Sequence, residues 1–166
     1  MNIEKSKILK LFIITPNTIF KDHRGEYIES YNKEIYLNSG IGVDFVQDDF
    51  SISAKGVLRG IHGDDKTWKL VSCIHGSFFL VVINNNKDSE DYRKCESFIL
   101  SEKNKKQVLI PPLYGNGHQV VTKKAIFHYK QSTFYNRKSQ FTIKWNDPIL
   151  NIQWPIKRPI LSKRDT

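Results

Sequence analysis

The chain has 166 residues, of which 39% are hydrophobic and 12% aromatic, and its formal net charge is +9. This composition excludes a disordered chain, and at this length we expect a single domain over residues 1–166. The positive balance favours an anionic partner. The basic residues are spread along the chain and no nucleic-acid-binding motif occurs, so we expect no nucleic acid partner.

Neither a membrane span nor a secretion signal is visible. No apolar run approaches twenty residues, and residues 1–7 lack an apolar core with a cleavage site. The two cysteines, Cys73 and Cys95, are too few for a disulfide scaffold. We therefore expect a cytoplasmic protein that does not bind membranes.

Short segments of β-type sequence alternate with turn signals along most of the chain. One helical turn is expected over residues 33–37, and turns are expected at 111–112 and 115–118. No long helix is predicted, so the pattern indicates an all-β sandwich or barrel with short peripheral helical turns. The expected strands span residues 7–14, 26–31, 45–53, 69–74, 77–83, 92–100, 107–110, 119–122, 125–132 and 141–145.

Three polar residues interrupt apolar sequence in and after the segment GVLRGIH, residues 56–62. They are Arg59, His62 and Lys69. The planar guanidinium of Arg59 suits a phosphate or a carboxylate. Two nearby cations would help to keep His62 neutral, which a general base requires. A metal site is the competing interpretation, with Asp64, Asp65 and His118 as further ligands, but the flanking cations oppose a dication.

Other candidates have ordinary structural explanations. Tyr129 shares a strand face with Phe127 and Gln131, and is either a core tyrosine or a general acid. His118 begins an expected strand, with a structural role and a ligand contact equally open. Arg24 lies in a β-turn and could grip a phosphate. Asp165, next to the end of the chain, would ordinarily be a surface carboxylate.

An ordered set of motifs resembles the nucleotide-sugar 3,5-epimerases typified by dTDP-4-dehydrorhamnose 3,5-epimerase. The resemblance extends from about Phe20 to Asp165. It rests on DxRG at residues 22–25, Glu29, FVQ at 45–47, SxS at 51–53, GVLRGIH at 56–62, KLV at 69–71, PP at 111–112, GH at 117–118, YK at 129–130, WNDP at 145–148, IxWP at 152–155 and LSxxD at 161–165.

The resemblance implies a cupin-like jelly roll, a homodimer, and catalysis without metal or cofactor. In such enzymes a histidine paired with an aspartate removes a proton beside a 4-keto group. A lysine stabilises the enolate and a tyrosine returns a proton on the opposite face. Carried over, His62 is the base, Asp165 its partner, Lys69 the enolate stabiliser and Tyr129 the acid. The implied substrate-binding residues are Arg24, Glu29, Gln47, Asp49, Arg59 and His118.

Two departures from the family pattern bear on the substrate. Asp49 stands where the family usually has asparagine near the nucleotide, and residues 63–68 lack the glutamine usual in the dTDP-sugar enzymes. The GDxKTWKL segment is more similar to epimerases of GDP-linked 4-keto-heptoses used for capsular polysaccharide. We therefore expect epimerisation at C3, C5 or both of such a heptose, with dTDP-4-keto-6-deoxyglucose as the alternative substrate.

Two other functions share this fold. A 3,4-ketoisomerase typically has a second histidine close to the first, whereas this chain offers Asp64 after His62. A catalytically silent sugar-binding cupin is the non-enzyme alternative. The joint presence of His62, Lys69, Tyr129 and Asp165 weighs against it.

Overall fold

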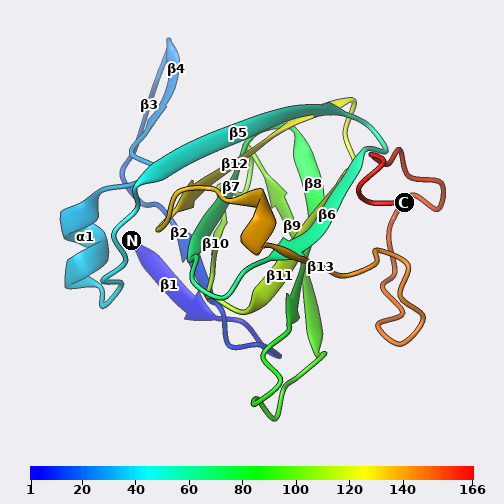
Figure 1. Cartoon of the computed structure of the whole chain (residues 1–166). Coiled ribbons are helices and arrows are strands. Elements are labelled where there is room, and N and C mark those ends of the chain that lie inside the picture. The colour runs from blue at the N-terminus through cyan, green and yellow to red at the C-terminus, as the bar shows by residue number, and fades with distance from the viewer.

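Two antiparallel β-sheets face each other in the computed structural model, which describes residues 1–166 (Figure 1). The all-β prediction is confirmed. The larger sheet has the strand order β1 (Asn2–Lys5), β2 (Phe12–Thr15), β10 (Gln107–Ile110), β7 (Lys69–His75), β12 (Lys124–Gln131) and β5 (Gln47–Ala54). The smaller sheet has the order β13 (Phe141–Thr142), β6 (Leu58–Gly63), β11 (Tyr114–Val120), β8 (Ser77–Asn84) and β9 (Cys95–Ser101).

Three short elements lie outside the sandwich. The hairpin of β3 (Ile19–Asp22) and β4 (Gly25–Ile28) projects away from it (Figure 1). Helix α1 (Lys33–Asn38) begins after Asn32, whose side chain accepts hydrogen bonds from two backbone N–H groups of the first turn, so the predicted helical turn is confirmed. A 3₁₀ turn, η1, spans Arg137–Ser139. None of the helices has the length and apolarity that crossing a membrane requires.

The main core lies between the two sheets and ends where the inward-facing residues become polar. Alternation along a strand turns every second side chain inward. On β7 the inward series is Cys73, Val71 and then Lys69, and on β12 it runs from Phe127 to Tyr129. The core therefore passes directly into a polar cavity at one end of the sandwich.

Two further apolar clusters cover the outer faces. Helix α1 and the segment after it pack Tyr36 and Ile41 against Leu70 and Leu109 on the larger sheet. The irregular C-terminal tail packs Trp154 and other residues over the smaller sheet. These clusters hold segments with little regular structure in fixed positions.

The predicted strand over residues 7–14 is correct only for its last three residues, which belong to β2. Before them the chain turns between β1 and β2, and Lys10 has a left-handed φ of 54°. The carboxylate of Glu96, on β9, accepts hydrogen bonds from the backbone N–H groups of Lys7, Ile8 and Leu9. A distant residue thus satisfies N–H groups that a strand would have paired locally.

The predicted turn at residues 115–118 is also wrong, because these residues lie within β11. Each pairs with β8, and β6 pairs on the other side. A β-carbon on Gly117 would lie 2.8 Å from the Ile61 side chain, and one on Gly60 would lie 2.6 Å from the Asn116 carbonyl oxygen. The glycines therefore allow close packing of β6 and β11, the strands that carry His62 and His118.

Candidate active site

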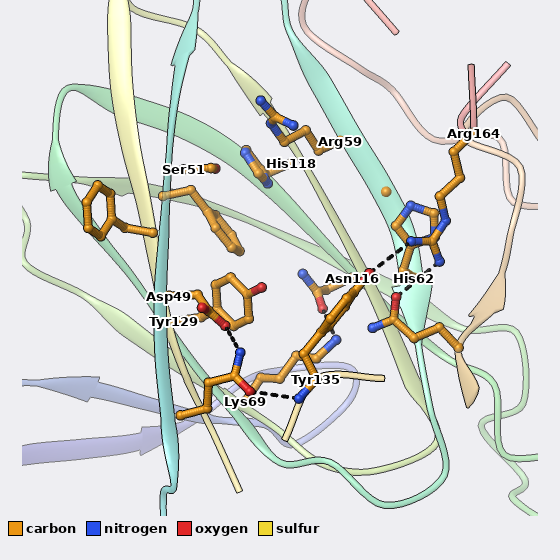
Figure 2. Close-up of a pocket in the computed structure, with 15 residues that line it drawn as sticks. Asp49, Ser51, Arg59, His62, Lys69, Asn116, His118, Tyr129, Tyr135 and Arg164 are labelled. Carbon is orange, nitrogen blue, oxygen red and sulfur yellow. Dashed lines mark hydrogen bonds between the residues drawn. The ribbon is translucent and has the colours of Figure 1, made fainter. Parts of the chain in front are cut away.

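A cavity of about 390 Å³ opens between the two sheets at the end where the core stops (Figure 2). Its walls come from β5, β7 and β12 of the larger sheet, from β6 and β11 of the smaller sheet, from the loop after β12 and from the tail. Seven of the ten predicted site residues line it, namely Gln47, Asp49, Arg59, His62, Lys69, His118 and Tyr129.

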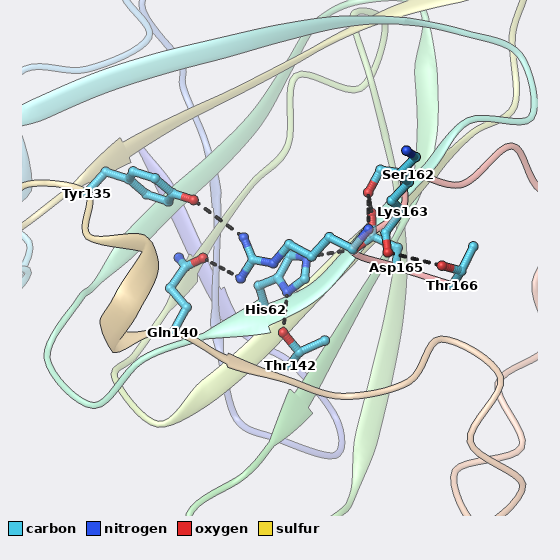
Figure 3. A network of polar contacts seen from close by, with 9 residues as sticks. His62, Tyr135, Gln140, Thr142, Ser162, Lys163, Asp165 and Thr166 are labelled. Atoms are coloured by element: carbon cyan, nitrogen blue, oxygen red, sulfur yellow. Dashed lines mark hydrogen bonds and ion pairs between the residues drawn. The ribbon is translucent and has the colours of Figure 1, made fainter.

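His62 and Asp165 form a buried pair at one side of this cavity. The Nε2 atom of His62 lies 2.8 Å from Oδ1 of Asp165, and its Nδ1 atom lies 3.1 Å from the Thr142 hydroxyl (Figure 3). With the Nε2 proton donated to the carboxylate, Nδ1 keeps its lone pair. Burial lowers the pKa of His62, as does the nearby Arg164 cation, while Asp165 opposes this shift. The imidazole is therefore neutral at neutral pH, as the sequence predicted.

A neighbouring residue of the C-terminal tail holds the Asp165 side chain in position. Its second carboxylate oxygen, Oδ2, accepts a hydrogen bond of 2.8 Å from the Ser162 hydroxyl, and its side chain is 5% exposed. The surface position that composition indicates for Asp165 is wrong. Its contact with His62 agrees with the resemblance.

Lys69 is a buried cation on the cavity wall. Its Nζ atom donates to Oδ1 of Asn116 at 3.4 Å, and burial lowers its pKa. Asp64, considered above as a metal ligand, instead accepts hydrogen bonds from the backbone N–H groups of Lys66 and Thr67 and closes that turn. No group of three or more histidine, cysteine or acidic side chains is arranged to hold a metal ion.

Tyr129 faces the cavity from the opposite sheet (Figure 2). Burial is the main cause that raises its pKa to about 12, and the nearby carboxylate of Asp49 adds to it. The phenol is therefore protonated across the neutral range. Asp49 itself accepts hydrogen bonds from the side-chain amides of Gln47, at 2.7 Å, and Gln131, at 2.8 Å.

Arg59 and His118 form a second polar region of the cavity. The Nε atom of Arg59 donates to the Ser53 hydroxyl at 3.1 Å. His118 stacks on Phe127 with ring centroids 4.0 Å apart, and its burial lowers its pKa to about 3. The buried Nε2 atom of His118 and the hydroxyl of Ser51 have no hydrogen-bond partner in the protein. Buried polar atoms without a partner require an explanation, and contact with a bound ligand is one.

The two remaining predicted residues do not reach this cavity. Arg24 lies at the tip of the β3–β4 hairpin, where its guanidinium pairs with Asp22 at 2.6 Å and its side chain is 79% exposed. Glu29 follows β4 and lies near the chain start and α1. Within one chain, Arg24 and Glu29 therefore do not line the cavity.

Sequence reasoning missed several residues that line the cavity. Arg164 donates to Gln140 at 3.0 Å and to the Tyr135 hydroxyl at 3.4 Å, which ties the tail to the loop after β12. Its position in the sequence, directly before Asp165, is the one feature that could have marked Arg164 as a site residue. Asn116 was assigned to a turn, which concealed its inward position on β11.

The arrangement suits proton transfer on opposite faces of one bound molecule. A neutral imidazole with a carboxylate partner belongs to the smaller sheet and the tail, and a protonated phenol belongs to the larger sheet (Figure 2). A buried cation lies on the same wall, where it can stabilise a developing oxyanion. Arg59 and Arg164 supply charge for a phosphate-bearing ligand.

Comparisons with known proteins agree with this chemistry. Residues 5–166 match the family model described as dTDP-4-dehydrorhamnose 3,5-epimerase. A Shigella flexneri dTDP-4-dehydrorhamnose 3,5-epimerase is 38% identical over 99% of this chain and 93% of its own length. The two solved structures described next have a TM-score of 0.93 each, which confirms the cupin-like jelly roll.

The first structure is dTDP-6-deoxy-D-glucose-3,5-epimerase from Legionella pneumophila in complex with dTDP-4-keto-L-rhamnose. It is 39% identical, with 99% of this chain and 89% of that chain covered. The second is dTDP-4-dehydrorhamnose 3,5-epimerase from Bacillus anthracis with TDP and pyrophosphate bound. It is 32% identical, with 99% and 95% covered.

Proposed function

The chain belongs to the dTDP-4-dehydrorhamnose 3,5-epimerase family, and we propose that it inverts C3, C5 or both of a dTDP-linked 4-keto-6-deoxyhexose. One observation carries the proposal: the His62–Asp165 pair faces Tyr129 across a single cavity (Figure 2). Inversion needs a base and an acid on opposite faces of the sugar ring.

His62 is the proposed base. The 4-keto group of the substrate acidifies the protons on C3 and C5, because the electron pair left behind spreads onto the ketone oxygen. The neutral imidazole takes one of these protons and becomes a cation beside the Asp165 carboxylate, 2.8 Å from its Nε2 atom. That carboxylate stabilises the cation and fixes the orientation of the ring.

Lys69 is the proposed partner of the enolate oxygen, and Tyr129 is the proposed acid. The Lys69 amine is buried on the cavity wall, where its charge acts through little water. The phenol of Tyr129 keeps its proton at neutral pH and can donate it to the carbon from the face opposite His62. Each step uses a side chain of this chain.

The dTDP-linked substrate is better supported than the GDP-linked heptose. The relatives described above are named for dTDP-linked sugars. The cavity also offers the aromatic ring of Tyr135 for a base, and guanidinium groups at Arg59 and Arg164 for a diphosphate. Asp49 and the GDxKTWKL segment keep a GDP-linked 4-keto-heptose for capsular polysaccharide as the second candidate.

Proton NMR in deuterated water tests the reaction. Incubation with dTDP-4-keto-6-deoxyglucose should replace hydrogen by deuterium at C3, C5 or both, and the exchanged position assigns the regiochemistry. His62→Asn should exchange at neither carbon. Exchange by this variant at the normal rate would remove His62 as the base. Absence of exchange with both the dTDP-linked and the GDP-linked substrates would refute the epimerase proposal.

We also propose that the protein acts as a homodimer. Large apolar side chains are exposed on the β3–β4 hairpin and along β5, including Phe20 at 66%, Tyr27 at 65%, Phe50 at 68% and Ile52 at 54%. Exposed apolar side chains of this number favour an interface with a second copy. Arg24 lies on the same hairpin and does not reach the cavity of its own chain. A second copy would give it a cavity to enter.

Mixing two inactive variants tests this arrangement. If Arg24 serves the partner's cavity, Arg24→Ala and His62→Asn chains co-expressed with different affinity tags should form a heterodimer with one complete site. The purified heterodimer should then recover up to about half of the normal activity per dimer. A heterodimer as inactive as its two parents would mean that Arg24 acts within its own chain or not at all.

A further inference from the structure

Asp49 is the only carboxylate that lines the cavity, which Arg59, Lys69 and Arg164 otherwise make cationic. The register of β5 and β12 pairs Asp49 directly with Tyr129. Directly opposed residues share a sheet face, with their β-carbons about 5 Å apart. Figure 2 shows the carboxylate beside the phenol ring.

Neutral groups, rather than cations, hold this carboxylate. Its Oδ2 atom accepts hydrogen bonds from the side-chain amides of Gln47, at 2.7 Å, and Gln131, at 2.8 Å. Gln47 is fixed in turn, because its Oε1 atom accepts a hydrogen bond from the backbone N–H of Tyr135. No lysine, arginine or histidine forms an ion pair with Asp49. Its negative charge is therefore oriented but not neutralised.

We propose that Asp49 is a positioning residue that keeps the Tyr129 hydroxyl protonated inside a cationic cavity. A fixed carboxylate beside a phenol disfavours the phenolate, which carries the same charge and cannot donate a proton. Burial and Asp49, in that order, raise the pKa of Tyr129, and Tyr135 adds a smaller contribution. The other titratable groups of the cavity are Arg59 and His62 from β6, Lys69 from β7, His118 from β11, Tyr135 after β12 and Arg164 from the tail.

Fluorine NMR of protein carrying 3-fluorotyrosine tests this directly. Fluorination lowers the pKa of every phenol and brings the titration into a range where the protein is folded. The chain has seven tyrosines, and the Tyr129 resonance is the one that disappears in Tyr129→Phe. In Asp49→Asn, which keeps an acceptor for both glutamines, its titration midpoint should fall by about one pH unit. Asp49→Glu should restore much of the shift.

Asp48→Asn is the matched control. Asp48 is the neighbouring residue on β5, but it points to the outer face and pairs with Lys130, so its removal should leave the Tyr129 midpoint unchanged. Equal midpoints in Asp49→Asn and the unaltered protein would overturn the proposal, as would an equal fall in Asp48→Asn.

The NMR measurement needs no substrate, so its result does not depend on the proposed epimerase reaction. Only the role of Tyr129 as the acid rests on that proposed function. If Tyr129 is the acid, the alkaline limb of the pH–rate profile should also move down in Asp49→Asn. A fall in the NMR midpoint without this movement would support the role of Asp49 and remove Tyr129 from the reaction.

Discussion

Replacing Asp165 by asparagine should slow proton abstraction by about a thousandfold. The substitution keeps the shape of the side chain and removes its charge. After abstraction His62 is a cation, and its Nε2 atom lies 2.8 Å from the carboxylate, with the two side chains 17% and 5% exposed. Two opposite charges centred about 4 Å apart attract by about 4 kcal/mol at an effective dielectric constant of about 20. This energy corresponds to about three powers of ten in rate.

The assay is the rate of deuterium incorporation from deuterated water, followed by proton NMR with saturating 4-keto substrate. Ser162→Ala is the matched control, because it removes the other hydrogen bond to the Asp165 carboxylate and leaves the charge in place. The exchange rate of that variant should fall by less than about tenfold, in line with the cost of one neutral hydrogen bond. If Asp165→Asn exchanges within tenfold of the unaltered enzyme, with its fold and dTDP binding intact, the carboxylate does not stabilise the imidazolium.

Two other predictions concern the larger sheet and the second polar region of the cavity. Tyr129→Phe should still exchange deuterium but should form the epimer at least about a hundredfold more slowly, because only delivery of a proton to the opposite face is lost. NMR of the products measures both the exchange and the epimer. Normal epimer formation would remove Tyr129 as the acid. His118→Phe should make the protein less sensitive to acid, because His118 is neutral in the fold with a pKa of about 3, against 6.5 for a free histidine. The unfolded chain therefore binds a proton between these pH values, and stability is lost as pH falls below 6.5. At pH 5 the loss is about 2 kcal/mol, from 1.5 pH units at about 1.36 kcal/mol each. Urea unfolding should show that the free energy of unfolding decreases from pH 7.5 to pH 5 by about 2 kcal/mol less in His118→Phe than in the unaltered protein. Equal decreases in the two proteins would contradict this prediction.

Local pattern predicted the central strands well because their faces are set by short-range alternation. The expected strand at residues 107–110 coincides with β10, and those at 69–74 and 77–83 differ from β7 and β8 by one residue at one end. The errors at residues 7–11 and 115–118 have long-range causes. Glu96 holds the first segment in a turn, and the glycines of the second fit against Ile61. Neither contact is visible in a sequence window.

The site residues also divide into those that local sequence indicates and those that depend on tertiary contacts. Arg59, His62 and Lys69 could be selected from sequence because each interrupts an apolar strand, and all three line the cavity. Asn116 could not, because its inward position depends on tertiary packing, and Arg164 was indicated only by its place directly before Asp165. The cause of the neutral state of His62 was also only partly predictable. The sequence pointed to Arg59 and Lys69, whereas burial and Arg164 contribute more than Lys69, and Arg59 acts on His118 instead.

The tail shows why a residue next to the chain end can be a precise part of a site. Asp165 depends on packing that begins well before it. Trp154 and Leu150 are buried against the smaller sheet, and the side chain of Gln119 binds both the N–H and the carbonyl of Ile156. Ile160 then pairs its backbone with the strand entrance at residues 56–58. These contacts fix the tail beside β6, so only the turn from Ser162 to Asp165 remains to be closed, by the bond from the Asp165 N–H to the Ser162 carbonyl. Composition describes this tail as irregular, but an irregular segment can be as fixed as a strand when its side chains are buried.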